Sequence, residues 1–240
     1  MPFINFDFST EVLPEKFAAR IQNAAIIRVD ENENCASKEE RVKVLQWHYC
    51  DKCDMRAPPR AHHCRICDTC ILKRDHHCFM VGTCIGFKNE RYFILMCFYV
   101  AICGLLGGSL TLNYVIRNVL PVLGSWVDMV FPFTLLRWFF GYIKGINCLL
   151  IVHVYIELVF GLYCFLTFLS QIAFNCYGKT PHEVDKKYPI KNTNDFNTTM
   201  KSVFGELWIL NFLFPMTIVF RQKGDGITWN ELKIVKSHKS

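Results

Sequence analysis

Seven cysteines and four histidines lie between Cys50 and Cys84, and this density constrains the fold more than any other feature of the 240 residues. The run reads YCDKCDMRAPPRAHHCRICDTCILKRDHHCFMVGTC. Thiolates separated by two residues, as in Cys50/Cys53 and Cys64/Cys67, have the spacing of tetrahedral zinc ligands. Dense cysteines also form disulfides in small secreted domains. We expect zinc here, because no cleavable secretion signal opens the chain and the cluster runs into an apolar segment with a basic flank.

The number of ligands indicates that one thiol is left over. Two closed zinc sites need about eight ligands. Seven cysteines with one histidine would supply them, and so would six cysteines with two histidines, which leaves a spare thiol. A spare thiolate beside a base is a candidate nucleophile. Cys78 is the best candidate, because it follows paired histidines with their own carboxylate, in the order Asp75-His76-His77-Cys78.

The same stretch resembles the cysteine-rich domain of the DHHC family of membrane protein S-acyltransferases, the palmitoyltransferases. The likeness runs through C-x2-C from Cys50, Pro59-x2-His62-His63-Cys64-x2-Cys67-x2-Cys70, Asp75-His76-His77-Cys78, Cys84 and Gly86-Phe87-x-Asn89-x3-Phe93. The resemblance implies one zinc ion on Cys50, Cys53, His63 and Cys70. It implies a second zinc ion on Cys64, Cys67, His77 and Cys84, and Cys78 then remains free.

The resemblance also implies a two-step reaction. Cys78 attacks the thioester of a long-chain acyl-CoA, and the acyl-enzyme then passes its palmitoyl group to cysteine thiols of membrane-associated proteins. His76 acts as the general base, and Asp75 holds the imidazole of His76 in the right tautomer. Phe79 and Met80 stand where most members of the family have Pro-Trp.

Two apolar stretches predict transmembrane helices. Tyr92–Ile116 contains no charged residue, and residues 146–177 contain one histidine and one acid, His153 and Glu157. Each stretch is long enough to cross a hydrocarbon layer of about 30 Å. His153 and Glu157 share a helix face and are expected to pair with each other. Between the spans, prolines, glycines and charges favour a lumenal or interfacial loop over a third span.

The basic residues predict the orientation. Residues 41–91 contain ten Lys/Arg against five Asp/Glu, whereas residues 117–145 contain three Lys/Arg. Positive loops remain cytoplasmic, so we expect the zinc region and the C-terminal tail in the cytosol and the chain in an endomembrane, either endoplasmic reticulum or Golgi. The reducing cytosol keeps the thiols free. The basic excess favours anionic lipids and the phosphates of CoA as partners.

We therefore predict an all-α polytopic membrane protein with two transmembrane helices and a cytosolic, loop-rich domain stapled by two structural zinc ions. The predicted segments are a cytosolic N-terminal segment (1–49), the cysteine-rich domain (50–91), a helix (92–117), the lumenal or interfacial loop (118–145), a helix (146–177) and a cytosolic tail (178–240). Acyl-CoA is the expected co-substrate. The expected partners are the bilayer and proteins with juxtamembrane cysteines, and nucleic acid is excluded by the adjacent membrane helix.

One alternative remains from another functional class. Residues 1–49 predict only a short, weakly amphipathic helix over Val12–Ile27 and an acidic linker, where the family typically has two transmembrane helices. A catalytically weak or inactive zinc-stabilised membrane adaptor would fit that difference. A zinc hydrolase is disfavoured, because it needs a metal with an open coordination position and eight ligands for two ions leave none.

Overall fold

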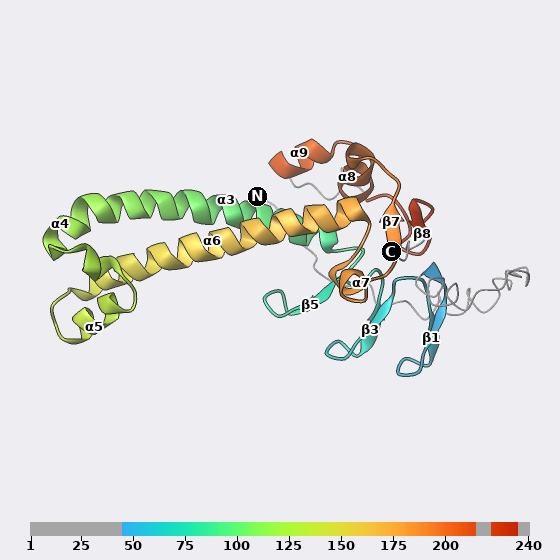
Figure 1. Ribbon diagram of the computed structural model, residues 1–240, viewed down its shortest axis with the longest axis horizontal. Coiled ribbons are helices and arrows are strands. Elements are labelled where there is room, and N and C mark those ends of the chain that lie inside the picture. Colours follow the sequence, from blue (N-terminus) through green and yellow to red (C-terminus); the bar gives the residue numbers. More distant parts are fainter. Residues whose placement is uncertain (1–44, 215–221, 235–240) are drawn as a thin grey trace, which may run out of the picture. The chain divides into compact units, whose positions relative to one another are not determined.

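The computed structural model describes residues 45–214 and 222–234 (Figure 1). The helix predicted over Val12–Ile27 lies outside these residues. The chain forms two compact units: residues 94–171 make one, and the residues before and after them make the other.

Three antiparallel hairpins begin the first unit. β1 (His48–Cys50) pairs with β2 (Met55–Ala57), β3 (His62–Cys64) with β4 (Thr69–Ile71), and β5 (His76–Cys78) with β6 (Thr83–Ile85). Each turn contains one residue in the left-handed region, with φ of 51°, 50° and 74° at Asp54, Asp68 and Gly82. Aspartate and glycine accept this conformation better than most residues.

The prediction of an all-α protein was therefore wrong for this region. The cysteine-rich stretch was predicted to be loop-rich, and no run of alternating apolar and polar residues marks a strand there. Strands of three residues are too short to show such a pattern. The turns that bring the cysteines together are flanked by short extended segments, and these segments pair as antiparallel strands.

The C-terminal part of the first unit adds short elements to the hairpins. β7 (Ile190–Asn192) pairs with β8 (Leu232–Ile234), and between them lie α8 (Phe196–Phe204) and α9 (Trp208–Leu213). The preceding helix, α7 (Pro181–Asp185), begins with a capping box, in which Thr180 and Glu183 satisfy each other's backbone N–H groups. α8 buries Met200, Val203 and Phe204.

The second unit consists of most of two long helices and the short elements that join them. α3 (Glu90–Tyr114) continues through a π-helical turn, η2 (Val115–Val119), into α4 (Leu120–Leu123), and α6 spans Gly145–Tyr177. These are two helices long and apolar enough to cross a membrane, as expected. The loop between them folds into η3 (Trp126–Met129) and α5 (Phe133–Phe139), both too short to be a third span.

Glycines allow α3 and α6 to pack closely within the second unit, where they run antiparallel (Figure 1). A Cβ at Gly104 would lie 2.9 Å from the carbonyl oxygen of Glu157 and 2.9 Å from the Cα of Gly161. A Cβ at Gly108 would meet Leu158 at 2.6 Å. Small residues spaced by four allow such close approach of helices in membranes. This pair of glycines therefore serves the helix contact inside the chain.

We predict that Gly104→Leu weakens this helix contact, because the new side chain has to displace backbone atoms of α6. Overpacking of a close contact typically costs about 1–3 kcal/mol. Thermal unfolding in detergent, followed by circular dichroism, measures the effect. Ser109→Leu adds a similar side chain at an exposed position of the same helix and serves as the control. Equal unfolding temperatures for the two variants would contradict the contact.

Candidate functional site

The three hairpins repeat with a period of 14 residues. Their first strands start at residues 48, 62 and 76, and the last residue of each first strand is a cysteine, at 50, 64 and 78. The left-handed turn residues at 54, 68 and 82 follow the same interval. Equivalent residues of the three hairpins therefore occupy equivalent positions. Two neighbouring hairpins can thus supply ligands to the same metal-binding cluster.

Two groups of four side chains lie close enough to hold a metal ion, and the ligand atoms of each group lie within 4.8 Å of one another. The first cluster contains Cys50, Cys53, His63 and Cys70, and the second contains Cys64, Cys67, His77 and Cys84. Each cluster takes a Cys-x2-Cys pair from one hairpin and a cross-strand histidine–cysteine pair from the next. The middle hairpin thus contributes to both clusters.

The distances within the clusters fit a tetrahedral zinc ion. Sγ of Cys53 lies 3.2 Å from Nδ1 of His63, and Nδ1 of His77 lies 3.3 Å from Sγ of Cys67 and 3.7 Å from Sγ of Cys84. Zinc–ligand bonds of about 2.0–2.3 Å in a tetrahedron separate the ligand atoms by about 3.5–3.8 Å. The donor set of thiols and imidazoles also suits zinc.

Burial and neighbouring thiols oppose the ionisation of one cysteine in each cluster. Burial, and then the thiols of Cys64 and Cys67, raises the pKa of Cys84 to about 12. Burial and the neighbouring thiols also raise the pKa of Cys70. Without a metal these sulfurs hold their protons. A bound divalent ion would stabilise the thiolates and release those protons.

Cys78 occupies the place in the third hairpin that Cys50 and Cys64 occupy in the first two. In those hairpins the residue three positions later is a second cysteine, whereas Val81 stands there in the third. After β6 the chain continues into α3 rather than into another hairpin. Among the described residues Cys78 therefore joins neither cluster, although its position is that of a ligand.

The alternation of side chains along β5 separates the metal ligand from the candidate catalytic residues. Successive residues of a strand point to opposite faces, so His77 faces the second cluster while His76 and Cys78 share the other face. Nδ1 of His76 lies 3.2 Å from Oδ2 of the buried Asp75. The ring of His76 also meets the edge of Phe93, at 5.2 Å between centroids. Asp75 and His76 are thus in contact, and Cys78 lies two residues after His76 on the same strand.

A family model described as DHHC palmitoyltransferase matches residues 43–188, which is more than half of the chain. The chain belongs to the DHHC palmitoyltransferase family. The match covers both clusters, Asp75, the strand β5 and both long helices. Membership of this family, together with the two apolar helices, supports an integral membrane protein.

Curated relatives agree with this family. The chain is similar to palmitoyltransferase ZDHHC22 of Homo sapiens, with 30% identity over 136 residues, and to that of Danio rerio, with 31% identity over 155 residues. The alignments cover 55% and 62% of this chain. They cover 50% and 54% of the two relatives, so the chain spans about half the length of the curated relatives it matches.

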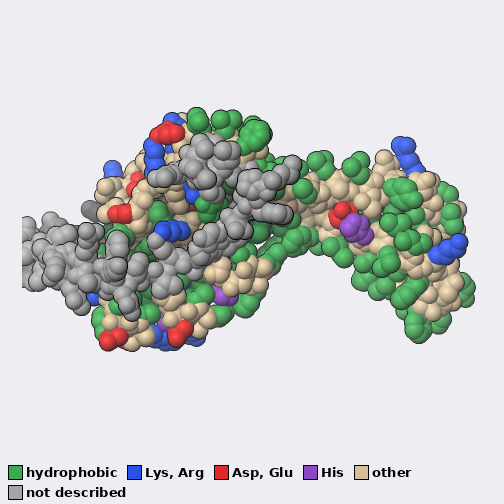
Figure 2. Space-filling view, turned by 180° about the vertical axis from the view of Figure 1, so that it is seen from behind, with side chains coloured by type: hydrophobic (Ala, Val, Ile, Leu, Met, Phe, Trp, Pro, Cys, Tyr) green, Lys and Arg blue, Asp and Glu red, His purple; other side chains and the backbone are tan. Residues whose placement is uncertain are grey.

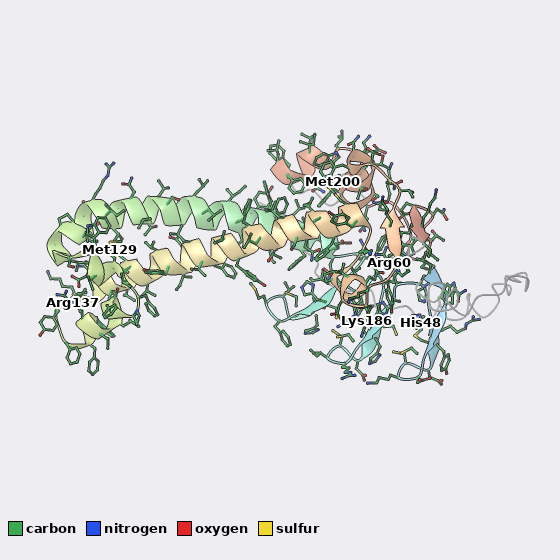
Figure 3. The ribbon with its side chains drawn as sticks, viewed as in Figure 1. His48, Arg60, Met129, Arg137, Lys186 and Met200 are labelled. Carbon is green, nitrogen blue, oxygen red and sulfur yellow. The ribbon has the colours of Figure 1, made fainter. Side chains whose placement is uncertain are left out.

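A buried ion pair ties the family's cysteine-rich hairpins to α7. Arg60 donates from Nε and Nη2 to the two carboxylate oxygens of Glu183, at 2.6 and 2.7 Å, and also to the carbonyl of Gly178 at 3.1 Å. Arg60 lies before β3, close to α7 (Figure 3). Although burial raises the pKa of Glu183, Arg60 outweighs burial and holds that pKa below its usual value. The carboxylate therefore stays charged while it caps α7.

A second set of buried polar contacts joins the start of α3 to the end of α6. Nζ of Lys73 donates to Glu90 at 2.6 Å and to Oδ1 of Asn175 at 3.2 Å. Trp229 packs against this region, 4.4 Å from the guanidinium carbon of Arg60. A cavity of about 200 Å³ is lined by Arg60, Lys73 and Trp229, among others, and not by Cys78. This cavity is therefore separate from the residue predicted to be the nucleophile.

Sequence reasoning missed several residues around this site. Arg60, the partner of Glu183, carries no motif signal in the sequence. His62 is a further case, since its ring lies 4.4 Å from that of His182. Burial, and then His182, lowers the pKa of His62 to about 4, so its ring is neutral at physiological pH. Only the proximity created by the fold reveals this pair.

We predict that Arg60→Ala strongly destabilises the first unit, because it leaves the carboxylate of Glu183 buried without its countercharge. Breaking a buried ion pair from one side typically costs about 3–5 kcal/mol. The midpoint of thermal unfolding of the metal-loaded chain in detergent measures this loss. Arg56→Ala, at an exposed position of β2, is the matched control. If both variants unfold at the wild-type temperature, the ion pair does not contribute to stability.

Proposed function

We propose that this chain is a protein S-acyltransferase that moves a palmitoyl group from acyl-CoA to cysteine thiols of membrane-associated proteins. The observation that carries the proposal is the position of Cys78. Its thiol shares a face of β5 with His76, which contacts Asp75, and it stands outside both metal-binding clusters. The names of the matched relatives support the same activity.

The reaction consists of two thioester exchanges. His76 accepts the proton of the Cys78 thiol, and the thiolate attacks the carbonyl carbon of acyl-CoA. The bond from that carbon to the CoA sulfur breaks, and the leaving sulfur takes the proton from the imidazolium. A cysteine of the acceptor protein then attacks the acyl-enzyme in the same way, which restores the Cys78 thiol. Such general-base assistance contributes about 10²–10⁴-fold in rate.

We assign structural roles to the eight cluster residues. They would hold two zinc ions, and each cluster supplies four protein ligands, so neither offers an open position for water or substrate. Zinc bound there supplies folding energy, on the order of 10 kcal/mol for a small structural site. The hairpins are thereby fixed, and β5 holds Cys78 and His76 in register.

The membrane location follows from the neighbours of Cys78. Phe79 and Met80 come directly after it and are 81% and 60% exposed, which is unusual for large apolar side chains. We infer that they contact lipid or the acyl chain, since α3 begins at Glu90, ten residues after Met80. The basic excess of residues 41–91 supports a cytosolic side for this region, facing CoA and cytosolic proteins, in an endomembrane of the endoplasmic reticulum or Golgi.

We predict that purified full-length chain incubated with an alkyne-labelled palmitoyl-CoA becomes labelled, and that hydroxylamine removes the label. Cys78→Ser abolishes labelling, because no thioester can form, while the zinc content measured by atomic emission stays at about two ions per chain. Cys103→Ser, at an exposed position of α3, is the control and keeps its label. Cys84→Ser loses about one zinc ion.

Each contrary result has a distinct meaning. Label retained by Cys78→Ser would move the nucleophile to another cysteine. Loss of zinc from Cys78→Ser would make this residue a metal ligand. A chain that holds zinc but takes no label from any acyl-CoA would act as the zinc-stabilised membrane adaptor.

We predict that Asp75→Asn slows acyl-enzyme formation, because an amide cannot stabilise the imidazolium of His76 or hold the same tautomer. The expected loss is on the order of 10²–10³-fold in the single-turnover rate. Zinc content should not change. Asp51→Asn, at an exposed position near the first cluster, controls for a general charge effect. An unchanged rate for Asp75→Asn would remove this carboxylate from the mechanism.

A further inference from the structure

The segment that joins α3 to α6 exposes many large apolar side chains. We name residues 124–143 the connecting module; it contains η3 and α5. Its most exposed side chains include Phe139, Tyr142, Phe140 and Trp126, which are 79, 73, 68 and 64% exposed. Figure 2 shows hydrophobic side chains over much of this end of the second unit, with Lys and Arg at its margins. In water such a surface would be costly.

The charged side chains of the connecting module pair with each other, although Oδ2 of Asp128 is buried without a hydrogen-bond partner among the described residues. Asp128 is fully buried and pairs with Nη1 of Arg137. Thr134 donates from Oγ1 to the carbonyl of Asp128 at 2.6 Å, and the guanidinium of Arg137 lies 5.6 Å from the ring of Tyr142. Figure 3 places Met129 and Arg137 among these short helices. The module therefore presents an apolar, aromatic exterior around a neutralised charge pair.

The connecting module lies beside α6 and not beyond its end. Tyr155 donates from its hydroxyl to the carbonyl of Met129 at 3.0 Å, and Met129 packs on the core formed by Val115, Val119, Ile151 and Val154. Tyr155 is ten residues from Gly145, the first residue of α6. Ten residues of helix extend about 15 Å. The module thus covers roughly the first three turns of α6.

The length of α6 indicates where the connecting module lies relative to the boundary of a membrane. The helix has 33 residues, which is about 50 Å and longer than a hydrocarbon layer of about 30 Å. At its other end Asn175 accepts from the buried Lys73, so that end lies in a polar environment. A helix that crosses the hydrocarbon needs about 20 residues, and 20 residues before Asn175 is Tyr155. The connecting module and Tyr155 therefore lie where α6 is expected to leave the hydrocarbon layer on the side away from Asn175.

The contact between His153 and Glu157 in α6 supports the same position of the membrane boundary. Nε2 of His153 lies 3.3 Å from Oε1 of Glu157, and the His153 side chain is 57% exposed. An exposed imidazole in the middle of the hydrocarbon would be costly, whereas headgroups and water solvate it at the boundary. Arg117, just after α3, belongs to the same end of the helix pair.

We propose that the connecting module is an interfacial anchor, whose aromatic side chains bind the boundary between headgroups and acyl chains at the end of the helix pair where α6 begins. Tryptophan and tyrosine gather at this depth because their rings are apolar and their edges are polar. The continuity of the module with both long helices favours lipid as its partner. The proposal rests on membrane insertion and does not depend on acyl transfer.

Depth-dependent quenching of Trp126 and Trp138 tests the anchor. Full-length chain and the Trp126→Phe/Trp138→Phe variant are reconstituted in phosphatidylcholine vesicles whose acyl chains carry bromine near the headgroup or near the methyl end. The difference in emission between the two proteins reports these two tryptophans. We expect shallow bromine to quench this difference emission more than deep bromine. Vesicles without bromine give the reference intensity.

A second pair of variants tests the aromatic surface. Phe139→Asp/Phe140→Asp should lose the shallow quenching of the two tryptophans while circular dichroism retains the helix signal, and Phe139→Leu/Phe140→Leu should keep most of it. Stronger quenching by deep bromine would overturn the proposal in favour of a buried re-entrant segment. No quenching by either lipid would assign the surface to water or to a protein. Quenching that appears only at high lipid-to-protein ratio would assign the surface to a second copy.

Discussion

The sharing of the middle hairpin between two metal-binding clusters is the constraint on which the rest of the first unit depends. β3 and β4 give His63 and Cys70 to one cluster, and the same hairpin gives Cys64 and Cys67 to the other. Neighbouring hairpins are thus held in fixed order and spacing. Strands of three residues have little stability of their own, so the ligands and not the backbone ladders determine where β5 lies.

Two buried contacts connect the metal-binding hairpins to the ends of the two long apolar helices. Arg60 links the hairpins to α7 through Glu183, and Lys73 links them to Glu90 at the start of α3 and to Asn175 near the end of α6. Both links are buried and charged, so each is costly to break. The strand that carries Cys78 is therefore held between the metal-binding clusters and the ends of the two apolar helices.

The sequence allowed much of the site to be predicted but little of its architecture. Ligand types at two-residue spacing predicted two metal sites, the resemblance to the DHHC family implied which residues form each cluster, and the long apolar runs predicted α3 and α6. The hairpins were not predicted, because strands of three residues are too short to show a periodic pattern of apolar residues. Arg60 and His182 were not predicted for another reason. Their roles depend on contacts between segments more than 100 residues apart, and no short sequence motif indicates such contacts.

The 14-residue repeat has a consequence for biosynthesis. A ribosome releases the ligands in chain order, so the first metal site can be completed once Cys70 has emerged, but the second has to wait for Cys84. During that interval Cys78 is already available, on a strand equivalent to the one that carries Cys64. The nascent chain would thus pass through a stage at which Cys78, the proposed nucleophile, competes with the ligands of the second cluster for a metal ion. The competition ends when the next six residues have emerged, because Cys84 then completes the second cluster.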